Sequence, residues 1–395
     1  MKIGSLFNYK LKRGLAGRRQ SCKNVETKFS KNDKVIWMHA ASLGEYEQGL
    51  PVLEKLKENY PEHKILITFF SPSGYENVIK KKHIADAICY LPFDKKVWID
   101  EFISNFQTEI FFTVKYDFWY NLLDEIKKSG AKTFVVSAYF YETQVFFKPY
   151  GNWFVKQLQK NIDWFFHQTK HSTALAKSIG LKNSITSGDT RFDRVKTKLS
   201  EDNSLPFIDE FKEGKTTIVF GSSWQSEERL AEIISNKHND LKIIIAPHDL
   251  KRVEHLQEIF TEAILYSELS SNPKLAINNE VLIVDSIGKL SRLYSYADLA
   301  VVGGGFHTAG LHNILEAAVF GIPVIFGNQY KKNPEADDLI FHKGGKSFED
   351  EFFASKYIFE LLKNPEILKK MGENAGEFVR SQPNSTEIIL KKILS

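Results

Sequence analysis

Residues 34–45 read KVIWMHAASLGE, and this stretch contains the unit from which we derive the fold. Residues 34–40 are mostly apolar, which is typical of a strand buried on both faces of a parallel sheet. The small residues 41–44 indicate a turn. Apolar residues at helical spacing then run as far as Tyr60, and Pro61 marks the helix end. The stretch therefore predicts a strand, a turn and a helix in succession.

The same unit recurs further along the chain. In the first half we expect further strands at 64–70, 109–115 and 133–140. A polar stretch at 196–214 interrupts the pattern, and a second series of expected strands follows at 216–223, 241–248, 280–286, 298–305 and 323–328. Apolar runs that alternate with helices predict parallel sheets covered on both faces.

The fold class predicted is therefore α/β, with two Rossmann-like, doubly wound domains that face a central cleft. A chain of 395 residues fits two domains of ordinary size. We expect ligands at the carboxyl ends of the strands, where doubly wound sheets bind them. The predicted division is a basic amphipathic segment at 1–30, a first domain at 31–195, a linker at 196–214 and a second domain at 215–395, with a last helix that returns to the first domain.

Composition excludes several classes of protein. The net charge of +4 is small for this length and gives no indication of nucleic-acid binding. Cys22 and Cys89 are the only cysteines, so a disulfide framework is excluded and a reducing cytoplasm is expected. The sequence shows no metal-ligand spacing and no D-x-D motif. It also lacks a secretory signal and any apolar run long enough to span a membrane.

The N-terminus is strongly basic. Eight lysines and arginines face one acid, Glu26, within residues 1–28. Phe7, Leu11 and Leu15 recur at every fourth position, as on one stripe of a helix. Such a segment suits an anionic membrane surface, although a solvated, frayed terminus has the same composition. Further along, aromatic residues with interleaved lysines crowd residues 134–156, which suits either a membrane interface or a domain core.

Two turns carry candidate chemistry. Ser42 and Glu45 have the S-x-x-E spacing of a helix capping box, but Glu45 also lies where a parallel sheet binds ligand. Residues 302–316 read VGGGFHTAGLHNILE, in which glycines follow a strand and a helix is expected to begin near His312 or Asn313. Glycines allow close approach to the backbone, and a helix N-terminus binds phosphate. The alternative is a glycine-rich turn with a polar cap.

Polar groups follow three more strands of the second half: Gly221-Ser222-Ser223, Pro247-His248 and Ser286-Ile287-Gly288-Lys289. Each alone is an ordinary turn. Together they line one edge of one sheet, as a nucleotide-phosphate site requires. Without a D-x-D motif, side chains and helix dipoles would stabilise the leaving phosphate, and we expect no metal.

Several motifs, in this order, resemble the 3-deoxy-D-manno-octulosonic acid (Kdo) transferases. They are HAASLGE (39–45), KYDFWYN (115–121), GDTRFDR (188–194), APH (246–248) and GGGFHTAGLHNILEAAVFGIPVIFGN (303–328). The resemblance implies the GT-B fold and inverting transfer from CMP-Kdo to the lipid A precursor. It implies no cofactor, and a position at the cytoplasmic face of the bacterial inner membrane.

By motif match, Glu45 corresponds to the family's general base. The donor residues implied by the match, together with the polar strand ends above, are Ser222, Ser223, Pro247, His248, Ile287, Gly288, Lys289, Gly304, Gly305, His312, Asn313, Ile314, Leu315 and Glu316. We expect Ser42, Lys115 and Asp117 to contact the acceptor or the donor carboxylate. The sequence departs from the family at Lys115, where most members have an acid, and at His248, where Arg is usual.

Three other functions remain open. A UDP-sugar 2-epimerase would use the same paired Rossmann framework, and so would a transferase with another nucleotide-sugar donor. A membrane-surface scaffold without turnover is the alternative that is not an enzyme. CMP-against-UDP competition separates the first two from Kdo transfer, and donor consumption with a lipid acceptor separates the third.

Overall fold

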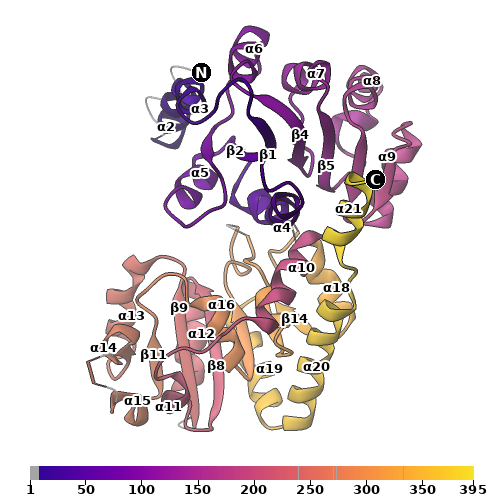
Figure 1. The fold of residues 1–395 in the computed structure, drawn as a ribbon. Coiled ribbons are helices and arrows are strands. Elements are labelled where there is room, and N and C mark those ends of the chain that lie inside the picture. Colours follow the sequence, from indigo (N-terminus) through magenta and orange to yellow (C-terminus); the bar gives the residue numbers. More distant parts are fainter. Residues whose placement is uncertain (1–8, 239, 270, 273, 309, 332) are drawn as a thin grey trace. The chain divides into compact units, whose positions relative to one another are not determined.

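The computed structural model describes residues 9–238, 240–269, 271–272, 274–308, 310–331 and 333–395. The chain divides into two compact units. Unit 1 comprises Met1–Asp193 and Pro383–Ser395, and unit 2 comprises Arg194–Gln382. Each unit is an α/β domain and is described by itself (Figure 1).

Unit 1 is built on a seven-stranded, wholly parallel sheet in the order β3-β2-β1-β4-β5-β6-β7. The strand predicted at 34–40 is confirmed as β1, at the middle of the sheet. The strands are β1 (Lys34–Ala40), β2 (Lys64–Phe69), β3 (Ala87–Tyr90), β4 (Gln107–Val114), β5 (Lys132–Ala138), β6 (Trp164–His167) and β7 (Ser184–Thr186).

Helices cover both faces of this sheet, and each face has its own apolar core. Trp37 is fully buried on one face and packs against Phe102, Phe106 and Phe111. The helical segments are α2 (Tyr9–Arg18), α3 (Ser21–Glu26), α4 (Leu43–Asn59), α5 (Pro72–Val78), α6 (Lys96–Ile103), α7 (Tyr120–Lys128), η1 (Val145–Phe147), α8 (Asn152–Asn161), α9 (Lys170–Ser178) and α10 (Thr190–Thr197, which crosses into unit 2).

The N-terminal segment is more integrated than its composition indicates. Phe7 lies outside the described residues, but α2 and α3 follow it and pack against β3. A side chain at Gly17 would lie 2.3 Å from the ring of Tyr90, so this glycine permits close packing. Val25 and Phe29 are buried in the core of unit 1. Residues from Ser21 onward therefore belong to the domain, which the sequence predicted to begin at residue 31, and contact of the basic segment with a membrane stays a prediction.

Unit 2 repeats the architecture with a second seven-stranded parallel sheet, in the order β10-β11-β9-β8-β12-β13-β14. Its strands are β8 (Thr216–Ser223), β9 (Leu241–Pro247), β10 (Ile264–Leu265), β11 (Val281–Ile283), β12 (Leu299–Val302), β13 (Val324–Gly327) and β14 (Gly345–Phe348). One core cluster joins the apolar residues of the strands to those of the flanking helices.

The helical segments of unit 2 are α11 (Ile208–Lys212), α12 (Gln225–Ser235), η3 (Leu250–Arg252), α13 (Val253–Ile259), α14 (Tyr266–Leu269), α15 (Leu275–Asn278), α16 (Leu290–Leu293), η4 (Tyr294–Tyr296), α17 (Leu315–Ala318), α18 (Pro334–Phe341), α19 (Glu351–Leu362) and α20 (Pro365–Ser381). The short segment η2 (Lys198–Ser200) precedes them.

The boundary between the two units does not fall in the linker predicted at 196–214. The units divide between Asp193 and Arg194, within α10. The polar sequence misled the prediction because α11 lies inside this stretch and buries Ile208 and Phe211 in unit 2.

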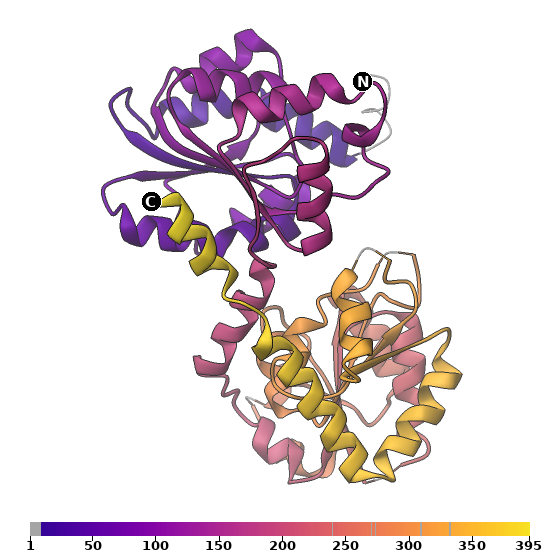
Figure 2. The ribbon, with the colours of Figure 1, turned by 90° about the vertical axis from the view of Figure 1, so that its right-hand side faces the viewer.

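The chain returns to unit 1 through α21 (Ser385–Ile393), which packs against α4 (Figure 2). Ile389, Leu390 and Ile393 join the core of unit 1. The predicted fold class is confirmed: both units are Rossmann-like, with parallel sheets between layers of helices. Within the described ranges, no helix is both long and apolar enough to cross a bilayer.

Candidate active site

The carboxyl ends of β1 and β4 bring three predicted residues together in unit 1. The Ser42 hydroxyl donates to the Glu45 carboxylate, and the Lys115 ammonium lies 3.7 Å from Glu45 Oε1. Ser42 occupies the N-cap position of α4, yet its side chain makes no hydrogen bond to the helix backbone. The capping-box arrangement is therefore absent. Glu45 instead forms a side-chain cluster with Ser42 and Lys115.

Asp117, the fourth predicted residue of this edge, is held by a buried histidine. His39 Nε2–H donates to Asp117 Oδ2 at 2.7 Å, and His39 Nδ1 lies 2.9 Å from Thr68 Oγ1. Burial alone would raise the pKa of Asp117. The hydrogen bond and charge of His39 outweigh it, so the pKa of Asp117 lies below its ordinary value. Asp117 is therefore an ionised group whose orientation is fixed by His39.

Two predicted residues, Lys115 in unit 1 and Ser222 in unit 2, have strained backbones, and so does Ser137. Lys115, Ser137 and Ser222 have φ values of 63°, 51° and 52°, in the left-handed region. Ser137 and Ser222 also lie at breaks in strand register near the carboxyl ends of β5 and β8. Such strain costs on the order of 1–3 kcal/mol per residue and gathers at functional sites, as do β-bulges.

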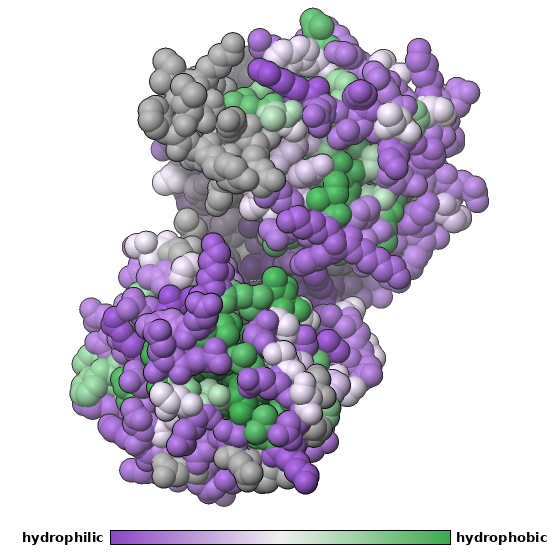
Figure 3. Space-filling model, turned by 90° about the vertical axis from the view of Figure 1, so that its left-hand side faces the viewer, coloured by the Kyte–Doolittle hydropathy of each residue, from purple (hydrophilic) through white to green (hydrophobic). Residues whose placement is uncertain are grey.

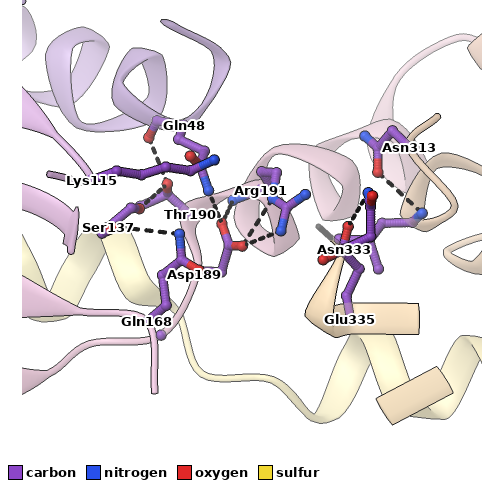
Figure 4. Close-up of polar contacts among 12 residues, drawn as sticks. Gln48, Lys115, Ser137, Gln168, Asp189, Thr190, Arg191, Asn313, Asn333 and Glu335 are labelled. Carbon is purple, nitrogen blue, oxygen red and sulfur yellow. Dashed lines mark hydrogen bonds and ion pairs between the residues drawn. The ribbon is translucent and has the colours of Figure 1, made fainter. Parts of the chain in front are cut away.

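A hydrogen-bonded network from the GDTRFDR motif supports this edge (Figure 4). Arg191 Nε and Nη2 donate to Asp189 Oδ2 at 2.9 and 2.7 Å, while Gln48 Nε2 donates to Asp189 Oδ1. Thr190 Oγ1 donates to the Gln48 carbonyl and lies 2.9 Å from Ser137 Oγ. The network joins α4, β5 and the turn before α10. It therefore fixes the strand ends beside Lys115.

In unit 2, the three glycines after β12 are explained by the packing of loops. A side chain at Gly303 would lie 2.0 Å from the Ser222 carbonyl, and one at Gly305 would lie 2.7 Å from Gly327 N. Gly304 has φ 90° and donates its N–H to Glu227 Oε1 at 3.0 Å. Protein atoms therefore lie where a side chain at these positions would be, and the binding of a ligand by the glycine loop stays a prediction.

Two neighbouring buried acids, Glu227 and Glu228, lie at the start of α12, and Glu227 contacts this loop. Glu227 also accepts the N–H of Trp224, and burial raises the pKa of Glu227 to about 7. Its neighbour Glu228 is 1% exposed and accepts hydrogen bonds from Arg252 Nε and Nη2. Glu227 thus holds the glycine loop to the start of α12, and Glu228 holds α12 to the segment after β9.

Four rings gather where β8, β9 and β12 end. Trp224 stacks on His248 with centroids 4.4 Å apart, and the rings of His248 and His312 are 4.7 Å apart. His307 meets Trp224 edge-on at 4.7 Å. Burial lowers the pKa of His312 to about 4, with smaller contributions from the other two histidines, and burial also lowers the pKa of His248. The structure therefore brings the predicted residues His248 and His312 together as neutral imidazoles.

The other predicted donor residues occupy neighbouring strand ends. Ser222 lies beside Gly303, while Ser223 is buried and its carbonyl accepts the N–H of His248. After β11, Ile287 is 81% exposed, Gly288 is left-handed, and Lys289 Nζ donates to Ser286 Oγ at 2.7 Å. Pro247 ends β9.

The helix expected near His312 or Asn313 begins later than predicted. The four-residue helix α17 starts at Leu315, because the Asn313 side chain accepts the N–H of Leu315 at 3.1 Å and replaces a helical turn. Asn313 Nδ2 also donates to Glu316 Oε1. Ile314 and Leu315 are buried in the core. Among residues 313–316, Asn313 and Glu316 are thus the two whose side chains are not buried in the core.

We expect His312 to lower the stability of unit 2 as the pH falls from 6.5 toward 4, whereas Glu227, whose pKa is raised to about 7, contributes in the opposite direction. The unfolded His312 takes up a proton near pH 6.5, whereas the folded residue resists protonation until about pH 4. Its contribution is thus present above pH 6.5 and lost below it, by about 2 kcal/mol after allowance for partial exposure. Urea unfolding of His312→Asn should show a smaller acid loss than wild type. The exposed control His255→Asn should retain the full loss, and equal slopes for both variants would contradict the assignment.

Sequence reasoning missed several residues that the structure brings to these sites: His39, Gln48, Asp189, Arg191, Trp224, Glu227, Glu228 and His307. The GDTRFDR motif was recognised without a role for its acid and its arginine. Glu227 stands three residues after Trp224, the capping-box spacing, which was an available signal. His39 lies 78 residues from Asp117, and no local pattern indicates that pair.

The two parallel sheets, each with polar residues at the carboxyl ends of its strands, define a GT-B type fold. A solved structure shares it over 91% of this chain and 99% of its own: UDP-GlcNAc 2-epimerase from Neisseria meningitidis bound to UDP-GlcNAc, with TM-score 0.62 and 16% identity. At that identity the likeness concerns the fold alone.

Sequence comparison shows a similarity to one family. Residues 14–194 match the family model described as 3-deoxy-D-manno-octulosonic-acid transferase (kdotransferase). The 3-deoxy-D-manno-octulosonic acid transferase of Aquifex aeolicus (strain VF5) is 28% identical over 80% of this chain and 81% of its own length. That of Chlamydophila psittaci (strain ATCC VR-125 / 6BC) is 26% identical over 84% and 78%. The chain resembles the Kdo transferases over most of its length.

Proposed function

We propose that the chain is an inverting glycosyltransferase that moves Kdo from CMP-Kdo to the lipid A precursor, with Glu45 as general base. The observation that carries this proposal is the arrangement around Glu45. Its carboxylate is bound by Ser42 and lies beside Lys115, at the carboxyl edge of the sheet in a unit that matches the Kdo transferase model.

In the reaction we propose, an acceptor hydroxyl attacks the anomeric carbon of Kdo. The bond from that carbon to the phosphate oxygen breaks, and CMP leaves with the bonding electrons. Glu45 takes the hydroxyl proton as the new C–O bond forms, a contribution of roughly 10²- to 10⁴-fold. A carboxylate serves as base here because the hydroxyl becomes acidic while it bonds to an oxocarbenium-like carbon.

Unit 2 would hold CMP at the carboxyl ends of β8, β9, β11 and β12. Lys289 supplies a cation, and the neutral imidazoles of His248 and His312 supply N–H donors for the phosphate. Asn313 and Glu316 are available for ribose hydroxyls. These side chains suffice for a monophosphate leaving group, so the proposal includes no metal and no cofactor.

The direct test is transfer of Kdo from CMP-Kdo to the tetraacylated lipid A precursor by the full chain, with product identified by mass spectrometry. Tight binding of CMP, with at least about tenfold weaker binding of UMP and UDP, supports the assignment. Preference for UDP together with epimerisation of UDP-GlcNAc would identify a 2-epimerase instead. CMP binding without any donor consumption would identify a protein without turnover.

Lys115 is proposed to bind the carboxylate of the donor sugar. The left-handed backbone at Lys115 places its ammonium near Glu45, where the reacting sugar would lie. A charge-assisted hydrogen bond contributes about 1.5–3 kcal/mol. We therefore expect Lys115→Met to raise the KM for CMP-Kdo about 10- to 100-fold, and Lys115→Arg to raise it less. An unchanged donor KM with a lowered kcat would show that Lys115 acts through Glu45 alone. Lys177→Met, at an exposed position of α9, is the matched control.

We also propose that unit 1 docks on the anionic cytoplasmic face of the inner membrane, where the acceptor resides. Phe134 and Phe140 are buried, but other aromatic residues of unit 1 remain exposed. They follow the carboxyl ends of β2, β3, β4 and β5, on the same edge as Glu45: Phe70, Trp98, Tyr116, Tyr120, Tyr141, Tyr150, Trp153 and Phe154. Exposed Lys148 and Lys156 accompany them, as at a headgroup interface.

Vesicle flotation tests this docking. We expect Trp153→Ala to weaken binding to phosphatidylglycerol vesicles about three- to tenfold, because an aromatic residue at the interface is lost. Phe341→Ala is the control, since Phe341 is an exposed aromatic residue of unit 2. If both variants bind as wild type does, the aromatic edge of unit 1 is not the docking surface.

A further inference from the structure

Unit 1 contains a cavity of about 840 Å³ that the proposed reaction does not use. Leu15 and Cys22 of α2 and α3 line one side, and Pro92, Phe93 and Trp98 line the other, before and within α6. Figure 1 places α2 and α3 beside α5 and α6. Figure 3 views unit 1 from this side, and hydrophobic surface lies among hydrophilic side chains on the part that is not grey. The volume is that of a ligand site.

Cations surround this apolar floor. Arg18, Arg19 and Lys95 contribute to the lining, with Asp94 and Glu101 as the acids. The carboxylate of Asp94 caps the start of α7, where it accepts the N–H groups of Asn121 and Leu122 at 3.0 and 2.9 Å. The remaining charges therefore favour an anionic ligand.

Arg18 has a buried N–H group that an anionic ligand could bind. Its guanidinium lies over the rings of Phe70 and Phe93, at 4.4 and 5.2 Å, and its Nη2 donates to the Phe70 carbonyl. Its Nε is buried and has no hydrogen-bond partner in the part of the chain that the structure describes. A buried donor without an acceptor is costly, and a ligand oxygen beside Arg18 would satisfy it.

The cavity is connected to the edge that carries Glu45. Phe70, which Arg18 contacts, donates its N–H to the Ala40 carbonyl, and Ser71 donates to Ala41, next to Ser42. Phe70 also stacks on Trp119, with ring centroids 5.0 Å apart. Trp119 follows Asp117 by two residues in the sequence. The cavity and the candidate catalytic edge are thus parts of one surface of unit 1.

We infer that this cavity is a subsite for an acyl chain and an adjoining phosphate of the lipid acceptor. The inference rests on the proposed function, which supplies an amphiphilic acceptor. Leu15, Phe93 and Trp98 would contact the chain, while Arg18, Arg19 and Lys95 bind the phosphate. Bulk phospholipid has the same chemistry, but the contacts through Phe70 tie the cavity to the reacting edge and favour the acceptor as its occupant.

Alkylation of Cys22 tests occupancy without any measurement of transfer. Cys22 lines the cavity, whereas Cys89, the other cysteine, is buried. Burial, with the nearby acids Glu101 and Glu26, raises the pKa of Cys22 to about 11, so N-ethylmaleimide is applied in mildly alkaline buffer. We expect saturating tetraacylated lipid A precursor in nonionic detergent to slow alkylation at least about tenfold. Equal protection by phosphatidylglycerol, or no protection by the precursor, would overturn the inference.

Cavity filling supplies the second test. We expect Cys22→Trp to raise the acceptor KM at least about tenfold while the donor KM stays unchanged. Lys95→Gln, which leaves the packing intact, should raise the acceptor KM in the same direction. Ala16→Trp, on the exposed face of α2, is the control and should behave as wild type. Unchanged acceptor KM values in both cavity variants would overturn the inference while transfer itself persists. If wild type transfers no Kdo, the proposed function fails, and the alkylation assay still reports on the cavity.

Discussion

Glu45→Gln and Glu45→Ala should lower the kcat for Kdo transfer by about 10²- to 10⁴-fold while CMP binding stays unchanged. The reason is that both variants remove the group that would accept the proton of the attacking hydroxyl. CMP binding is expected to persist because the predicted donor residues lie in unit 2. The measurement is single-turnover transfer from CMP-Kdo to the lipid A precursor, with CMP affinity measured by calorimetry.

The control for Glu45 comes from the same helix. Glu58 lies at the exposed end of α4 and pairs with Lys55, so Glu58→Gln should transfer Kdo as wild type does. A capping role for Glu45 would give another pattern, with full activity and a loss of about 0.5–2 kcal/mol in stability. The Ser42 hydroxyl donates to the Glu45 carboxylate and makes no cap bond to the helix backbone, which favours the catalytic role.

The regular elements were predictable because burial leaves a clear pattern in the sequence. The strands at 34–40 and 216–223 were predicted with their observed bounds, since both are long and their apolar residues are uninterrupted or nearly so. Short strands such as β7, with sequence SIT, carry too few apolar residues to be recognised. The return of the last helix to unit 1 agrees with its apolar positions Ile389 and Ile393, which need a sheet face to cover them.

The sites were predictable only in part, because their decisive contacts join distant segments. Ser42, Glu45, Lys115 and Asp117 could be placed at one edge, since parallel strands end at the same side of a sheet. The hydrogen bond from His39 to Asp117 spans 78 residues, and that from Gly304 to Glu227 spans 77. Neither leaves a local signal. In the glycine run, the close packing of Gly303 against Ser222 and of Gly305 against Gly327 likewise has no local signal in the sequence.

Arg252→Met should destabilise unit 2 by about 3–5 kcal/mol, because it leaves the buried carboxylate of Glu228 without its cation. Glu228 is 1% exposed, and Arg252 donates to both of its oxygens. The same pair holds α12 against the segment that carries His248, so we also expect weaker CMP binding. Hydrogen exchange of the β8 and β9 amides, with and without CMP, measures both effects.

A surface ion pair between α12, the helix of Glu228, and α19 provides the comparison for Arg252. Arg229 lies 3.4 Å from Glu351, with side chains 53% and 22% exposed, so Arg229→Met should cost less than about 1 kcal/mol. The double variant Glu228→Leu/Arg252→Met should recover most of the loss, since it removes the buried charge together with its partner. If Arg252→Met costs no more than Arg229→Met, the carboxylate of Glu228 must reach water when its partner is lost. In that case the side chain of Arg252, and not the surrounding fold, would be what shields the Glu228 carboxylate from water.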